Sequence, residues 1–167
     1  MKQVRRLISV VLCVMMIIST LSMPVAAGEG ITDVAGHWAQ ETVTKWLETG
    51  LINGYGDGVF KPDASITRAE FYTLVDNVLG LQDSSSISFS DVHAEDWYRE
   101  TIAKAVVAGY ANGYTDNTFK PERSISRQEV AVVVANIMNY ETSYDSDAVY
   151  DQVYQFIDGV DVAEWAI

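Results

Sequence analysis

The sequence predicts an all-α protein built from tandem helix–loop–helix repeats. Three observations predict it: the chain repeats itself at a spacing of 59 residues, each repeat holds two apolar patterns with helical spacing, and a glycine-rich loop separates the two patterns. One helix–loop–helix unit cannot bury a wide apolar stripe by itself. The second helices of the repeats are therefore expected to pack together into a bundle.

The chain begins with an expected secretory signal peptide, residues 1–27. A basic start and an apolar run precede Val25-Ala26-Ala27, which supplies the small residues that a signal peptidase requires. A retained membrane anchor is the alternative, but the apolar run is short for a spanning helix. The single cysteine, Cys13, lies in this segment, so the exported part is expected to rely on its hydrophobic core instead of disulfides.

The charge of the chain limits its partners. The sequence has 11 basic and 23 acidic residues, and cleavage of the signal peptide would leave eight basic residues and a net charge of −15. Such an acidic surface argues against nucleic acid and, after cleavage, against an anionic membrane as general partners.

The first repeat is expected at residues 31–81. Trp38 precedes an apolar pattern that predicts a first helix through Val43, Trp46 and Leu47, and Gly50 suits the left-handed end of that helix. The second helix carries an apolar stripe of five positions: Phe71, Leu74, Val75, Val78 and Leu79. Its start is set by Thr67 and Glu70, which have the spacing of a capping box.

The second repeat, residues 87–140, follows the same plan. Its first helix is predicted through Ile102, Ala105 and Val106, and Ser126 with Glu129 repeats the capping box before a second stripe that ends at Met138. A polar linker, residues 141–155, and the truncated start of a third repeat, residues 156–167, are expected to follow.

The opening FSDV…W, the loop NGYGDGVFKPD and the helix start SITRAE resemble those of S-layer homology repeats, and the resemblance covers two full repeats and the opening of a third. It implies a pseudo-threefold helical bundle at the bacterial cell surface, in the cell wall or S-layer. It also implies noncovalent anchoring to an acidic secondary cell-wall polysaccharide that commonly carries pyruvate ketals. In the family the ligand meets the arginine of the TRAE-type motif, which corresponds here to Arg68 and, in the altered ISRQE, to Arg127.

The distribution of basic residues points to the same site without the resemblance. Arginine in the first turn of a helix is locally unfavourable because the helix N-terminus carries a partial positive charge. An anion bound there by backbone N–H groups and the guanidinium makes the arrangement favourable. The alternative is that each arginine pairs with a nearby acid, such as Asp57 or Asp63. Five of the eight basic residues beyond the signal peptide lie between a loop and its second helix: Lys61, Arg68, Lys120, Arg123 and Arg127.

The candidate glycan contacts therefore combine cations, aromatic residues and loop aspartates. Each tryptophan that opens a repeat could stack on a sugar or anchor the core, and Tyr55 and Tyr114 have the same two interpretations. Besides Arg68 and Arg127, the set is Lys61, Lys120, Trp38, Trp97, Trp165, Asp57 and Asp116.

Metal binding and catalysis find little support in the sequence. The loops lack the ligand order of an EF-hand, so we expect no metal and no cofactor. His37 and His93 do not align between the repeats, and no nucleophile motif or glycosidase carboxylate pair stands out, so we expect no enzyme activity. Two other functions stay open: an interaction module completed by another such chain or an S-layer protein, and the anchor remnant of a truncated surface enzyme.

Overall fold

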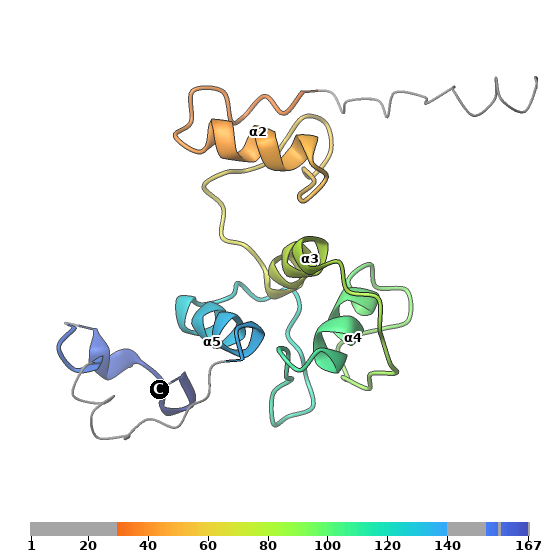
Figure 1. The fold of residues 1–167 in the computed structure, drawn as a ribbon, viewed down its shortest axis with the longest axis vertical. Coiled ribbons are helices and arrows are strands. Elements are labelled where there is room, and N and C mark those ends of the chain that lie inside the picture. The colour runs from red at the N-terminus through yellow and green to blue at the C-terminus, as the bar shows by residue number, and fades with distance from the viewer. Residues whose placement is uncertain (1–29, 140–152, 157, 167) are drawn as a thin grey trace, which may run out of the picture. The chain divides into compact units, whose positions relative to one another are not determined.

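The computed structural model describes residues 30–139, 153–156 and 158–166 (Figure 1). The signal peptide expected at residues 1–27 and most of the linker expected at residues 141–155 lie outside the described residues. Within the described ranges the regular structure is helical and includes no strand, which confirms the predicted all-α class. The elements are α2 (Gln40–Glu48), α3 (Arg68–Leu79), α4 (Arg99–Val107), α5 (Arg127–Ile137) and the short 3₁₀ helices η1 (Gly159–Asp161) and η2 (Glu164–Ala166).

The described chain divides into two compact units. Residues 30–40 and 54–62 form the first unit, and the remaining described residues form the second, which contains α3, α4 and α5. No helix among the described residues is both long and apolar enough to cross a membrane.

Capping boxes begin α3 and α5, as the sequence predicts. Before α3, the Thr67 hydroxyl accepts a hydrogen bond from the Glu70 N–H, and the Glu70 carboxylate accepts one from the Thr67 N–H at 2.8 Å. Ser126 and Glu129 form the same reciprocal pair before α5. Local side-chain chemistry therefore fixes both helix starts.

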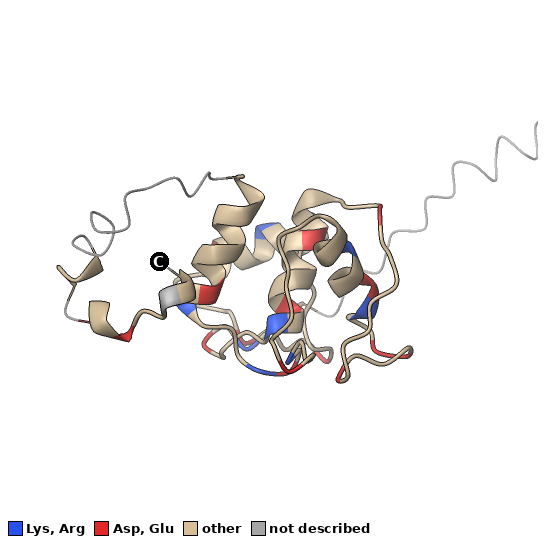
Figure 2. Ribbon diagram, turned by 90° about the horizontal axis from the view of Figure 1, so that it is seen from below, with Lys and Arg blue, Asp and Glu red and all other residues tan. Residues whose placement is uncertain are grey.

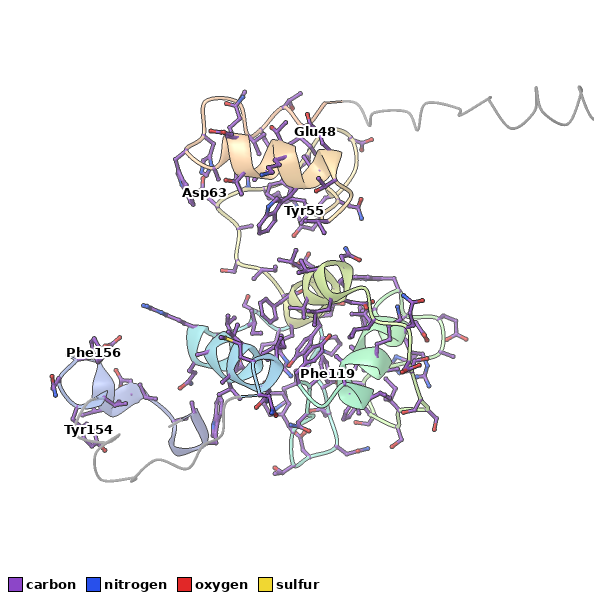
Figure 3. The ribbon with its side chains drawn as sticks, in the orientation of Figure 1. Glu48, Tyr55, Asp63, Phe119, Tyr154 and Phe156 are labelled. Carbon is purple, nitrogen blue, oxygen red and sulfur yellow. The ribbon has the colours of Figure 1, made fainter. Side chains whose placement is uncertain are left out.

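The core of the second unit lies between α3, α4 and the second-repeat loop. Ile102 and Phe119 are fully buried, and Figure 3 shows Phe119 in the interior of this unit. The Tyr72 ring stacks on Tyr110, with centroids 6.0 Å apart, and tilts against Phe119 at 5.2 Å. Among the described elements, α3 and α4 form the most extensive helix–helix contact.

The apolar stripes of the second helices are only partly buried. Phe71, Val75 and Ile137 pack against the core, whereas Val78 is 57% exposed and Met138 is 61% exposed. The side of α3 that is buried is not the apolar stripe. Its buried residues are Arg68, Ala69, Tyr72 and Asp76. A buried ion pair and an aromatic stack thus occupy the place where the apolar pattern predicts helix–helix packing.

The two repeat loops are held by the same kind of aspartate clamp, although their tips differ in backbone conformation. In the first unit the Asp33 carboxylate accepts from the N–H groups of Phe60 and Lys61, at 2.9 and 2.7 Å. In the second unit Asp91 holds the corresponding pair, Phe119 and Lys120, at 2.8 Å each. Both lysines have positive φ angles, 59° and 56°. An aspartate from the opening of each repeat therefore fixes the loop of that repeat.

Glycine is required at the point where each loop closes. The Tyr55 N–H donates to Val59 O at 2.8 Å, and a Cβ atom on Gly54 would lie 2.6 Å from that same oxygen. At the corresponding Gly113, a Cβ atom would lie 2.9 Å from Thr118 O and 2.2 Å from the Phe89 ring. A side chain at either position would therefore force the loop open.

Candidate functional site

The start of α3 lies against the loop of the second repeat. The N–H groups of Arg68 and Ala69 donate to the carbonyl oxygens of Arg123 and Pro121, both at 2.9 Å. The Ile125 N–H donates to Ile66 O at 3.1 Å, just before the helix. The first two bonds satisfy first-turn N–H groups of α3 that have no partner inside the helix. The loop of one repeat thus supplies the acceptors that the helix start of the other requires.

The Arg68 side chain is enclosed by this contact. It is 4% exposed, its Nε donates to Phe119 O at 2.9 Å, and its Nη1 lies 3.0 Å from Glu129 Oε1. The guanidinium carbon lies 4.7 Å from the centre of the Phe119 ring and 5.0 Å from that of Tyr114. Arg68 therefore pairs with an acid of the second repeat, where the sequence suggested Asp57 or Asp63.

Glu129 joins the two sides of the contact. Besides Arg68, it accepts hydrogen bonds from the Tyr114 hydroxyl, from the Ser126 N–H and hydroxyl, and from Arg123. Burial alone would raise the pKa of Glu129, but the hydrogen bonds from Tyr114 and Ser126 and the charge of Arg68 outweigh it and hold the pKa below its usual value. Glu129 thus stays ionised and keeps the pair intact at neutral pH.

Three cations of the loops lie against tyrosine rings at the surface. Lys120 Nζ is 4.2 Å from the centre of the Tyr114 ring, and the Arg123 guanidinium is 5.2 Å from the same ring. In the first unit, Lys61 Nζ lies 4.5 Å from the Tyr55 ring. Basic and acidic positions alternate along the loops (Figure 2). Each loop therefore presents positive charge beside an aromatic face.

Arg127 has a different environment from its counterpart Arg68. It begins α5 and is exposed, and its side chain makes no hydrogen bond or ion pair with another described residue. The 59-residue shift aligns these two arginines in sequence, but only Arg68 is buried in the folded protein.

The remaining candidates are at the surface. Trp38, Trp97 and Trp165 are 90%, 62% and 60% exposed, so none of the three is a core residue. Asp57 and Asp116 are also exposed. Asp116 lies 3.3 Å from Lys120 Nζ, and a hydrogen bond from the Thr118 hydroxyl is the main cause that lowers its pKa.

Sequence reasoning missed the residues that hold the loops in place. Asp33 and Asp91 were visible only as part of the repeat opening, and the 59-residue shift does not align them because the second opening is one residue longer before its tryptophan. The spacing of Ser126 and Glu129 predicts a helix cap at Glu129 but does not predict its pairing with Arg68. Comparing ITDV with FSDV one residue out of register would have found the aspartates. No pattern in the sequence marks the pairing across 61 residues.

Metal coordination has no support in the described part of the chain. No cluster of three or more His, Cys, Asp or Glu side chains is arranged there to hold an ion.

Comparison with known proteins identifies the repeats. The family described as the S-layer homology domain matches residues 30–71 and 88–131. A surface-layer 125 kDa protein of Lysinibacillus sphaericus is 29% identical over 90% of this chain and 12% of its own length. A surface layer protein of Brevibacillus choshinensis is 30% identical over 85% of this chain and 13% of its own length. A cellulosome-anchoring protein of Acetivibrio thermocellus is 35% identical over 59% of this chain and 23% of its own length.

The chain thus spans about an eighth of the length of the two surface-layer relatives. Those relatives are proteins of the cell surface, in agreement with the location that the sequence predicts. The two matched segments cover the helix–loop–helix repeats found in the structure. The chain belongs to the S-layer homology domain family.

Proposed function

We propose that this chain anchors its protein to the bacterial cell surface by noncovalent binding of an acidic, pyruvylated secondary cell-wall polysaccharide. The observation that carries the proposal is the pairing of exposed cations with tyrosine rings on both repeat loops. Similarity to the cellulosome-anchoring protein of Acetivibrio thermocellus supports an anchoring role. The proposal includes no catalytic step.

The loops offer both kinds of contact that an acidic sugar needs. The carboxylate of a ketal accepts hydrogen bonds from Lys120 and Arg123, and the apolar face of the sugar stacks on an aromatic ring. Trp97 opens the same repeat and is 62% exposed, so we assign it a stacking role. Lys61 offers the matching charge in the first unit, beside Tyr55. Two loops of one kind give the anchor two contacts and hence avidity.

Lys120 already has an acidic neighbour, which the ligand must replace. The Lys120–Asp116 pair spans 3.3 Å, and the two side chains are 38% and 54% exposed. Exposed pairs of this kind contribute little, typically below about 1 kcal/mol. A glycan carboxylate can therefore exchange with Asp116 at small cost.

Arg68 takes a different role from the one that its motif suggests. Its guanidinium is buried and donates to Glu129 and Phe119, so we assign it to positioning the loop that carries Lys120 and Arg123. Arg127 begins α5 and is exposed, so it stays in the proposed site as a further contact for the acidic sugar.

Binding to purified cell-wall glycan tests the proposal. We expect Lys120→Ala to weaken binding about fivefold, equivalent to about 1 kcal/mol, and Lys61→Ala with Lys120→Ala to weaken it further. Lys45→Ala, which removes an exposed lysine from α2, is the matched control and should bind normally. Removal of the pyruvate ketals from the glycan should abolish the difference between wild type and variants. Equal binding before and after that removal would exclude recognition of the acidic group.

A further inference from the structure

We propose that Asn112 and Gly113 form a deamidation site, and that its isoaspartyl product opens the second-repeat loop and weakens the glycan contact. The deamidation needs only water and does not depend on the glycan proposal, whereas its effect on anchoring rests on that proposal. The first repeat carries the same dipeptide, Asn53 with Gly54. Asparagine followed by glycine is the pair in which this modification is fastest, because glycine has no side chain to hinder ring closure.

The reaction is an intramolecular substitution followed by hydrolysis. The backbone nitrogen of Gly113 attacks the side-chain carbonyl carbon Cγ of Asn112, the Cγ–Nδ2 bond breaks, and Nδ2 leaves as ammonia with the proton of the Gly113 N–H. Water then opens the resulting succinimide ring. Addition of water at Cγ gives aspartate, and addition at the main-chain carbonyl carbon gives isoaspartate, in which the backbone runs through the former side chain. Either product carries a new carboxylate.

The two groups that must react are unrestrained in the structure. Asn112 is exposed, so water reaches its side chain. Among the described residues, neither the Asn112 side chain nor the Gly113 N–H makes a hydrogen bond. The nitrogen can therefore approach Cγ without first breaking a bond to this part of the chain.

Asn117, in the same loop, is the natural comparison because each of these requirements is blocked there. Its side chain donates to Ser88 O at 3.0 Å. The N–H that would have to attack belongs to Thr118, and it donates to Asp116 Oδ1 at 3.1 Å. Thr118 is also β-branched, so its side chain crowds the attacking nitrogen. The same loop thus pairs a reactive asparagine with a protected one.

An isoaspartate has no room to relax at this point of the chain. On one side Ala111 is buried, at 1% exposed, and on the other the Tyr114 N–H donates to Thr118 O at 2.7 Å. Between them Gly113 is packed so closely that a Cβ atom would lie 2.2 Å from the Phe89 ring. Isoaspartate lengthens the backbone here by one C–C bond, about 1.5 Å. The added length must therefore displace Tyr114.

Displacement of Tyr114 changes the proposed glycan contact. Lys120 Nζ lies 4.2 Å from the centre of the Tyr114 ring, and the Arg123 guanidinium lies 5.2 Å from it. The Tyr114 hydroxyl also donates to Glu129. The new carboxylate arises two residues before this ring, where it offsets the positive charge that attracts an acidic sugar. A copy that has aged at the cell surface thus binds the glycan more weakly than a new one.

Mass spectrometry of aged protein tests the modification. The chain carries Asn53→Gln, so that only the second loop can react, and is held in mildly alkaline buffer at physiological temperature. Deamidation adds about 1 Da, and fragmentation of the tryptic peptide of residues 105–123 assigns that gain to a position. We expect Asn112 to react at least about tenfold faster than Asn117. Equal rates at the two positions would overturn the proposal.

Two measurements on the same aged protein test the consequence. Amide hydrogen exchange at the Tyr114 N–H should rise about tenfold relative to fresh protein. Binding to purified acidic cell-wall glycan should fall at least about threefold. Asn112→Gln in the same background is the matched control, because its longer side chain closes a larger ring far more slowly. In that variant both exchange and binding should stay as they are in fresh protein.

The outcomes separate this proposal from the glycan proposal. Unchanged exchange at Tyr114 in deamidated protein would overturn the opening of the loop. Faster exchange with unchanged glycan binding would overturn the effect on anchoring. Fresh protein that fails to bind the glycan would instead overturn the glycan proposal, and the mass and exchange results would still decide the modification.

Discussion

Replacement of Arg68 by alanine tests the role that the structure gives this residue. Arg68 is 4% exposed, and its guanidinium donates to Phe119 O at 2.9 Å and pairs with Glu129 at 3.0 Å. Removing one member of a buried ion pair typically costs about 3–5 kcal/mol. Glu129 keeps its bonds from Tyr114, Ser126 and Arg123, so we expect the lower end, about 3 kcal/mol.

Urea denaturation followed by helical circular dichroism measures this loss. With a slope of about 1–3 kcal/mol per molar urea, a loss of about 3 kcal/mol lowers the midpoint by about 1–3 M. The protein is kept at low micromolar concentration so that association between copies does not contribute to the measured stability.

Arg127→Ala is the matched control, because it removes the arginine at the same position of the second repeat. That side chain is exposed, so its loss should change stability by no more than about 0.5 kcal/mol. An equal midpoint shift for the two variants would refute the inference that Arg68 is structural and Arg127 is not. A near-wild-type midpoint for Arg68→Ala would refute the buried contact itself.

Three further predictions concern the same unit. Tyr110→Phe should be neutral or stabilising in urea denaturation because the buried Tyr110 hydroxyl has no hydrogen-bond partner among the described residues, whereas Tyr114→Phe should cost about 1 kcal/mol or more because its hydroxyl donates to Glu129. Asp91→Ala should raise amide hydrogen exchange about tenfold at the two loop N–H groups that Asp91 holds, and unchanged exchange would contradict its role as a clamp. Because the pKa of Glu129 is lowered, its contribution to stability is complete above the unfolded value near 4.5 and is lost as pH falls through the lowered folded value, so Glu129→Gln should flatten the dependence of stability on pH between 6 and 3.

The local features of the fold could be predicted from the sequence because the interactions that set them are local. Thr67 and Glu70 stand three residues apart, and their reciprocal bonds begin α3 where the spacing indicates. The left-handed φ of 71° at Gly50 was predicted in the same way, from a glycine at the end of an apolar pattern. Such interactions can be read from a short window of residues.

The packing of the helices could not be predicted in the same way. The apolar stripe of α3 predicts a buried face through Val78, yet that residue is 57% exposed, and the buried side of the helix includes Arg68 and Asp76. Periodicity assumes that charged residues stay in water, and it fails where a charge finds a buried partner. The partner of Arg68 lies 61 residues away, at a distance that no local pattern encodes.

The arginine at the helix start depends on both local helix chemistry and long-range packing. Its position at the positive end of the helix dipole is unfavourable, so a carboxylate or a carbonyl oxygen must lie near it in the folded protein. For Arg68 that requirement is met inside the chain, by Phe119 O and Glu129 of the next repeat. A sugar carboxylate and a loop of the same chain both offer oxygen acceptors to the same donors. The role of such an arginine is therefore decided less by its motif than by whether a neighbouring loop covers it. Arg68 and Arg127, alike in sequence and opposite in exposure, are the pair in which that rule can be measured.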